Sequence, residues 1–138
     1  MLKVKLDEGA FKPERAHTYD AGMDLRSPKA VQIPAHGNSI IDTGVHIEIP
    51  EGYAGILMSK SGLNVKHDIT SEGVIDCKYT GSIVVKLYNN GSTSYKVERG
   101  DKITQLLIMP ISIEYIEVVD EITQNSERGD NGFGSTGK

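Results

Sequence analysis

The chain has 138 residues, a formal net charge of −4 and 38% hydrophobic residues. This length suits one globular domain. The acidic balance argues against a broad nucleic-acid interface, and no apolar run approaches the roughly 20 residues that cross a bilayer. We therefore expect neither nucleic acid nor a membrane as a partner. The single cysteine, Cys77, excludes an internal disulfide and fits a reducing compartment, so we expect a cytoplasmic protein.

Short alternating segments predict an all-β fold. Apolar and polar residues alternate over 2–6, 45–49 and 83–88, which is typical of strands. Residues 103–108 and 111–119 are rich in β-branched side chains and are also predicted to be strands. For the second of these segments a helix is the alternative, because glycine and proline are missing as far as residue 128.

Turn signals separate these segments. Asn89-Asn90-Gly91 predicts a hairpin turn, and Gly100-Asp101 predicts a second turn. One short helical turn is expected over residues 61–65. Many short strands separated by frequent turns are typical of a sandwich or a jelly roll.

An acid and a tyrosine lie close together in the segment that precedes residues 83–88. If Cys77-Lys78 form a turn, Asp76 and Tyr79 converge on one pocket. A carboxylate in such a pocket can act as a general base on water. The alternative is that Asp76 caps the turn and Tyr79 is a half-buried residue of a sheet.

Three further segments carry polar groups suited to a ligand. Ser61 and Gly62 begin the predicted helical turn, whose free N–H groups suit phosphate, and an ordinary N-cap at Ser61 is the alternative. Asp24 is expected either to orient a hydrated metal ion or to pair with Arg26. Gln105 interrupts an apolar strand, so its amide is expected to be structural or to contact a ligand.

The last eleven residues hold an arginine, a phenylalanine and four glycines. The guanidinium of Arg128 suits phosphate, and the ring of Phe133 suits stacking on a base. Glycine-rich turns also form anion-binding nests of backbone N–H groups. These groups predict a lid that orders over a nucleotide polyphosphate, and a frayed C-terminus is the alternative.

Taken together, these segments resemble the five ordered motifs of the trimeric dUTP pyrophosphatases (dUTPases). The motifs are Ala21-Gly22-Met23-Asp24-Leu25, Lys60-Ser61-Gly62-Leu63, Gly73-Val74-Ile75-Asp76 with Tyr79 and Gly81, Gly100-Asp101-Lys102-Ile103 with Gln105, and Arg128-Gly129 with Gly132-Phe133-Gly134-Ser135-Thr136-Gly137. The resemblance spans residues 21–137. Five motifs in the same order are not expected by chance.

The resemblance implies a jelly-roll-like β-sandwich or barrel with one short helix and a flexible glycine-rich tail, assembled as a homotrimer. We expect a core over residues 1–122 and a tail over 123–138 that closes over an active site between subunits. The implied reaction is Mg²⁺-dependent hydrolysis of dUTP to dUMP and pyrophosphate. This reaction keeps uracil out of DNA and supplies dUMP for dTMP synthesis.

The resemblance also implies roles for single residues. Asp76 is implied to activate the water that attacks the α-phosphorus, and Tyr79 to pack against the deoxyribose. Mg²⁺ is implied to be held mainly by the triphosphate, with Asp24 near it through water. Arg128 is implied to bind the γ-phosphate and Phe133 to stack on uracil. The other implied substrate-binding residues are Lys60, Ser61, Gly62, Thr70, Gly73, Val74, Ile75, Gln105, Gly134 and Ser135.

The chain departs from the family pattern in three places. Lys60 stands where the family usually has arginine, Asn64 replaces a small residue, and Asp130-Asn131 replace a more neutral pair. We expect these changes to tune affinity without abolishing activity. Two other functions stay open. One is a dCTP deaminase-like enzyme, and the other is a nucleotide-gated regulatory protein of the phage type that binds a protein partner.

Overall fold

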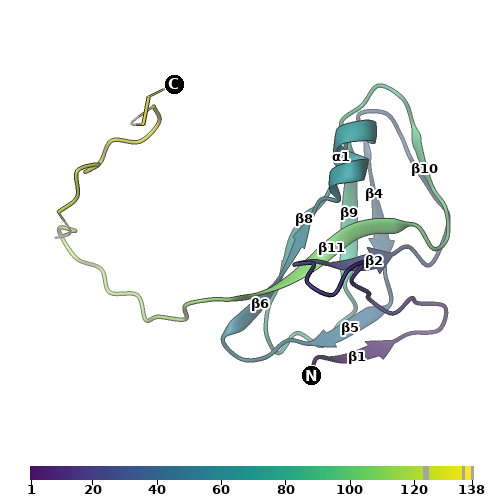
Figure 1. The fold of residues 1–138 in the computed structure, drawn as a ribbon, viewed down its shortest axis with the longest axis horizontal. Helices are drawn as coiled ribbons and strands as arrows, with labels where there is room; N and C mark the ends of the chain where they lie inside the picture. Colours follow the sequence, from purple (N-terminus) through teal and green to yellow (C-terminus); the bar gives the residue numbers. More distant parts are fainter. Residues whose placement is uncertain (123–124, 135, 138) are drawn as a thin grey trace.

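The computed structural model describes residues 1–122, 125–134, 136 and 137. Strands dominate this part of the chain, with one short helix among them, which confirms the predicted all-β class (Figure 1). The elements are β1 (Lys3–Leu6), β2 (Met23–Arg26), β3 (Val31–Ile33), β4 (Asn38–Asp42), β5 (Val45–Glu48), β6 (Tyr53–Met58), α1 (Ser61–His67), β7 (Ile69–Thr70), β8 (Glu72–Ile75), β9 (Val84–Asn89), β10 (Tyr95–Val97) and β11 (Lys102–Pro110).

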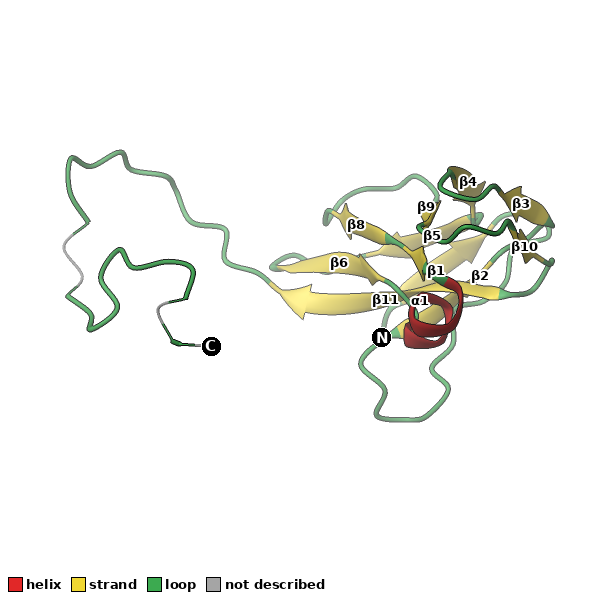
Figure 2. Ribbon diagram, turned by 90° about the horizontal axis from the view of Figure 1, so that it is seen from above, coloured by secondary structure: helices red, strands yellow, loops and turns green. Residues whose placement is uncertain are grey.

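The strands pair mostly with partners that are distant in sequence. One sheet has the order β2-β11-β6-β8, a second has the order β4-β9-β7, and β1-β5 and β10-β3 form two further pairs. All of these pairings are antiparallel. Figure 2 shows the long strand β11 running beside β6. This arrangement is jelly-roll-like, as predicted.

The sheets share one hydrophobic core. In β9, Val85 and Leu87 are fully buried while Val84 and Lys86 are exposed, so the alternation in the sequence marks the inward face. The same rule holds in β5. The core joins residues from all four sheets and includes Leu25, Ile33, Ile41, Val45, Ile47, Leu57, Ile69, Val97, Ile103 and Leu106. Within the described ranges, no helix has both the length and the apolar character needed to cross a bilayer.

The strand predicted over residues 111–119 is wrong. Strand β11 ends at Pro110, and residues 111–122 are all exposed and form neither a strand nor a helix. Figures 1 and 2 show this segment leaving the body of the molecule. β-branched residues favour a strand where a neighbouring strand offers them a packing surface. No described strand offers one here, which explains the error.

The hairpin predicted at Asn89-Asn90-Gly91 is also wrong, although the chain does bend there. Strand β9 pairs with β4 and β7, whereas the next strand, β10, pairs with β3. The buried Asn89 amide donates to the carbonyls of Ile33 and Thr93, and its carbonyl oxygen accepts from the Gly91 N–H. These bonds fix a longer crossing between two sheets. The predicted turn at Gly100-Asp101 is confirmed, with a φ of 91° at Gly100.

Candidate active site

Three of the predicted motifs meet near the end of β6 in the four-stranded sheet. We call this group, formed by Asp24, Lys60 and Gln105, the Lys60 edge. In β11, Gln105 lies opposite Asp24 of β2 on one side and opposite Met58 of β6 on the other. Ser59 and Lys60 follow Met58 directly and lead into α1. Gly22 belongs here because a Cβ at this position would overlap the side chain of Gln105. The strand register therefore gathers residues that lie about 80 positions apart in the sequence.

Asp24 holds two ammonium groups at this edge. Its carboxylate is 7% exposed, and its Oδ1 pairs with Lys60 while its Oδ2 lies 2.7 Å from Lys102 Nζ. Burial alone raises the pKa of Asp24, but hydrogen bonds from Lys102 and Lys60 and their positive charges outweigh burial and lower it. The predicted alternative, a pair with Arg26, is wrong: Arg26 donates to the Gly100 carbonyl instead. The role of Lys102 was missed, because only the register brings it to Asp24.

Ser59 connects this edge to the residue between β7 and β8. Its carbonyl accepts from Gln105 Nε2 at 3.0 Å, and its hydroxyl donates to the Ser71 carbonyl at 3.1 Å and accepts from the Ser71 N–H at 2.9 Å. The Thr104 hydroxyl, which is fully buried, donates to the Met58 carbonyl and lies 2.7 Å from the Ser71 hydroxyl. Gln105 is therefore structural in this subunit, as one of the two predicted roles allowed.

The predicted helical turn is confirmed and longer than expected, because α1 covers Ser61–His67. The N-cap is Lys60, with no side-chain capping bond, so the predicted cap at Ser61 is wrong. Ser61 and Gly62 are exposed. In the first turn of a helix, backbone N–H groups have no partner within the helix. The backbone of Ser61 and Gly62 thus directly follows Lys60 in the chain, next to the edge defined above.

The turn that follows β8 brings Asp76 and Tyr79 together. Cys77-Lys78 form the predicted turn, with a φ of 67° at Lys78 and a bond from the Tyr79 N–H to the Asp76 carbonyl. Both side chains line a cavity of about 320 Å³, together with Val74, Ile75, Ser82 and Val84. Gly81 is required because a Cβ there would overlap the Tyr79 phenol. The predicted convergence on one pocket is confirmed.

Strand β8 offers free backbone groups beside this cavity. It is the last strand of its sheet and pairs with β6 on one side only, in the part of the chain that the structure describes. An edge strand presents unpaired N–H and C=O groups. Gly73, Val74 and Ile75 lie within it, and Thr70 ends the preceding strand β7, where its hydroxyl accepts from Asn90 Nδ2 at 3.2 Å.

The Asp76–Tyr79 turn and the Lys60 edge lie at opposite ends of the β6–β8 pair. Glu72 lies opposite Met58, near Lys60 and Gln105, whereas Ile75 lies opposite Gly55. Asp76 is four residues beyond Glu72, and strand residues rise about 3.3 Å each, so roughly 13 Å of strand separates them. A single subunit therefore does not bring Asp76 to the Asp24–Lys60–Gln105 edge.

The tail lies away from both groups of residues (Figures 1 and 2). Arg128 Nε donates to the Asn131 carbonyl at 3.0 Å within the tail itself, and Phe133 is fully exposed. Gly134 has a φ of 80°. The predicted site residue Ser135 lies outside the described residues. The tail thus presents its arginine and its ring to no other part of its own subunit that the structure describes.

The donor set bears on the implied magnesium ion. Among the residues that the structure describes, no three His, Cys, Asp or Glu side chains lie together in a way that could hold a metal ion. Both oxygens of Asp24 already face lysine ammonium groups. Mg²⁺ commonly binds through substrate phosphates and keeps several waters. The residues present therefore fit an ion that arrives with a polyphosphate, and they do not form a protein cage.

These observations define an antiparallel, jelly-roll-like protein. The turn that carries Asp76 and the Lys60 edge are separate parts of one candidate site. A model of the dUTPase family matches residues 10–137. The chain belongs to the dUTPase family.

Relatives from distant organisms match the whole chain. The deoxyuridine 5′-triphosphate nucleotidohydrolase of Clostridioides difficile is 44% identical, over 99% of this chain and 97% of that protein. The enzyme of the same name from Candida glabrata is 39% identical, over 100% of this chain and 97% of that protein. The dUTPase of Staphylococcus bacteriophage 80alpha, solved with dUPNHPP, has a TM-score of 0.93 at 34% identity and covers 100% of this chain and 99% of that chain.

Proposed function

We propose that this chain hydrolyses dUTP to dUMP and pyrophosphate. The observation that carries the proposal is the Asp76–Tyr79 turn, in which a carboxylate and an aromatic ring line the same cavity. Identities of 39% and 44% to deoxyuridine 5′-triphosphate nucleotidohydrolases over the full chain support it. The hydrolysis keeps uracil out of DNA and supplies dUMP for dTMP synthesis.

Asp76 is the general base in this proposal. It takes a proton from a water molecule while the water oxygen attacks the α-phosphorus. The bond from the α-phosphorus to the oxygen that bridges to the β-phosphorus breaks, and pyrophosphate leaves. Tyr79 packs against the deoxyribose and leaves no room for a 2′-hydroxyl. The free edge of β8, over Gly73, Val74 and Ile75, supplies backbone donors and acceptors for the uracil ring.

The phosphates bind at the other group of residues. Lys60 supplies positive charge, and the backbone N–H groups of Ser61 and Gly62 donate to phosphate oxygens. Arg128 binds the γ-phosphate through its planar fork of donors. Phe133 stacks on uracil, and Gly134 and Ser135 complete the lid. A Mg²⁺ ion bound with the triphosphate would neutralise charge there, and Asp24 would lie near it through water.

The active site assembles from several subunits of a homotrimer. The separation of Asp76 from the Lys60 edge within one subunit supports this arrangement, as does the tail that runs away from its own body. A rotationally symmetric trimer joins different faces of neighbouring subunits. Such an interface can place the Asp76–Tyr79 turn of one subunit against the Lys60 edge of the next, with the tail of a third as the lid.

A substrate panel tests the proposal. We expect rapid pyrophosphate release with Mg²⁺ from dUTP and little release from dTTP, dCTP or UTP. Ammonia release from dCTP would instead indicate the deaminase-like enzyme. If none of the four nucleotides reacts while dUPNHPP still binds, hydrolysis is refuted and the regulatory function takes its place. In that case, a pull-down with and without dUPNHPP tests for the protein partner.

A further inference from the structure

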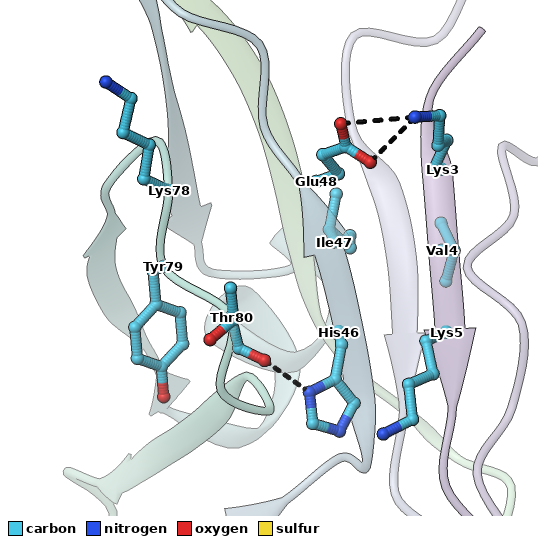
Figure 3. Close-up of a pocket in the computed structure, with 9 residues that line it drawn as sticks. All are labelled: Lys3, Val4, Lys5, His46, Ile47, Glu48, Lys78, Tyr79 and Thr80. Carbon is cyan, nitrogen blue, oxygen red and sulfur yellow. Dashed lines mark hydrogen bonds and ion pairs between the residues drawn. The ribbon is translucent and has the colours of Figure 1, made fainter.

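His46 contacts the turn that carries Tyr79. It belongs to β5, opposite Lys5 of β1, and its side chain is 19% exposed. Figure 3 shows its ring in direct contact with the Thr80 carbonyl, and His46, Thr80 and Tyr79 all line a cavity of about 360 Å³. Two segments far apart in the sequence thus meet at one imidazole.

Both ring nitrogens of His46 face acceptors. Nδ1 lies 2.8 Å from the Thr80 carbonyl oxygen, and Nε2 lies 3.0 Å from Asp7 Oδ2. A backbone carbonyl and a carboxylate accept hydrogen bonds and donate none. A neutral imidazole carries one N–H, so either tautomer leaves one of these two contacts without a proton. Only the imidazolium satisfies both.

The Thr80 contact bears directly on Tyr79. Thr80 is the next residue along the chain, and the Tyr79 ring folds over Gly81, where its hydroxyl donates to the Ser82 carbonyl at 3.1 Å. Fixing the carbonyl of Thr80 therefore fixes the peptide plane that separates the ring from the glycine it covers. Loss of that contact frees the backbone beneath the ring.

We propose that the imidazolium of His46 is a positioning residue for Tyr79, holding the Thr80 carbonyl so that the ring keeps its place beside the sugar. This inference rests on the proposed dUTP hydrolysis, in which Tyr79 excludes the 2′-hydroxyl. It makes discrimination against ribonucleotides depend on the protonation of a histidine outside all five motifs.

The surroundings of His46 determine the direction of the pH effect. The Thr80 carbonyl and the Asp7 carboxylate raise the pKa of His46, while burial and the nearby Lys5 act against them. Asp42 also interacts with the ring charge. The other charged or titratable residues that line the cavity are Lys3, Glu48, Lys78 and Tyr79. Both contacts are present below the pKa of His46, and one is lost as the pH rises through it.

The experiment combines histidine-ring NMR with kinetics. In ¹⁵N-histidine protein titrated over about pH 5 to 9, we expect His46 to keep two ring N–H groups above the ordinary histidine pKa of about 6.5. Asp7→Asn should move the His46 transition to lower pH, and with it the pH at which the KM for dUTP rises. His46→Ala should lower the ratio of kcat/KM for dUTP over UTP by about tenfold, through KM more than kcat.

Lys3→Ala is the matched control, because it breaks the exposed Lys3–Glu48 pair on the same two strands and leaves His46 in place. A His46 ring that is already neutral at about pH 6, below the ordinary histidine pKa of about 6.5, overturns the proposal. So does an unchanged dUTP-to-UTP ratio in His46→Ala, or, if that variant does not fold, a KM profile unmoved by Asp7→Asn. A wild type without dUTP hydrolysis refutes the proposed function, and the ring protonation then still decides whether His46 holds Thr80.

Discussion

At the scale of single residues, Asp24 and its two lysines decide how the sheet edge meets phosphate. A carboxylate this buried needs partners, because leaving it unpaired costs several kcal/mol. Lys60 and Lys102 supply them. Lysine is a compact charge on a flexible stem and lacks the bidentate fork of arginine. Lys60 thus keeps the charge that the family places here and gives up its directional donors.

Lys60→Arg tests how much that loss matters. We expect kcat/KM for dUTP to change by less than about tenfold, because Asp24 still holds a cation at the same place. Lys66→Arg, the same change at an exposed position of α1, serves as the control. A gain above roughly 100-fold, equivalent to about 2.7 kcal/mol of transition-state stabilisation, would show that Lys60 cripples the site.

Residue patterns predicted chemistry better than partners. Asp76, Tyr79 and the turn between them followed from local spacing, because a four-residue turn sets its own geometry. The partners of Asp24 did not, because Lys60 and Lys102 reach it only through the register of three strands. His46 was missed for the same reason: its two acceptors come from residues 7 and 80.

At the scale of elements, alternation found the strands that bury one face. Alternation identified β1, β5 and β9, and in β5 and β9 every second side chain is buried, as in a half-buried sheet. β-branched content identified β11. β-branched content failed over residues 111–119, which face no neighbouring strand that the structure describes. Neither pattern gave the strand register, and the register is what separates the Asp76–Tyr79 turn from the Lys60 edge within one subunit.

That separation predicts complementation between inactive subunits. We expect Asp76→Asn subunits and Lys60→Ala/Gln105→Ala subunits to be inactive alone, and to recover about one third of wild-type activity in trimers that contain both kinds of subunit. In every such mixed trimer, one of the three interfaces joins an intact Asp76 to an intact Lys60 and Gln105. The measurement is dUTP hydrolysis by trimers purified with two different tags. Absence of recovery in confirmed mixed trimers would place the whole site within one subunit.

At the scale of the whole molecule, the parts of the candidate site are distributed over one body and one arm. The body holds a single core and presents the Asp76–Tyr79 turn and the Lys60 edge at separate places. The arm carries Arg128 and Phe133 away from both. The resemblance implied a site between subunits with the tail as its lid, whereas the fold class and the spacing of residues within single motifs did not predict this distribution. It explains why the monomer presents the proposed catalytic carboxylate on an open cavity without a phosphate-binding group beside it.

The most direct measurement is the rate of dUTP hydrolysis by Asp76→Asn, compared with Asp120→Asn as the same change at an exposed residue outside the motifs. We expect Asp76→Asn to lose about 1,000-fold or more in kcat while still binding dUPNHPP, because general-base catalysis supplies about 10² to 10⁴ in rate. Asp120→Asn should match the wild type within about twofold. An Asp76→Asn enzyme that keeps more than about a tenth of wild-type kcat would contradict the role of Asp76 as the base.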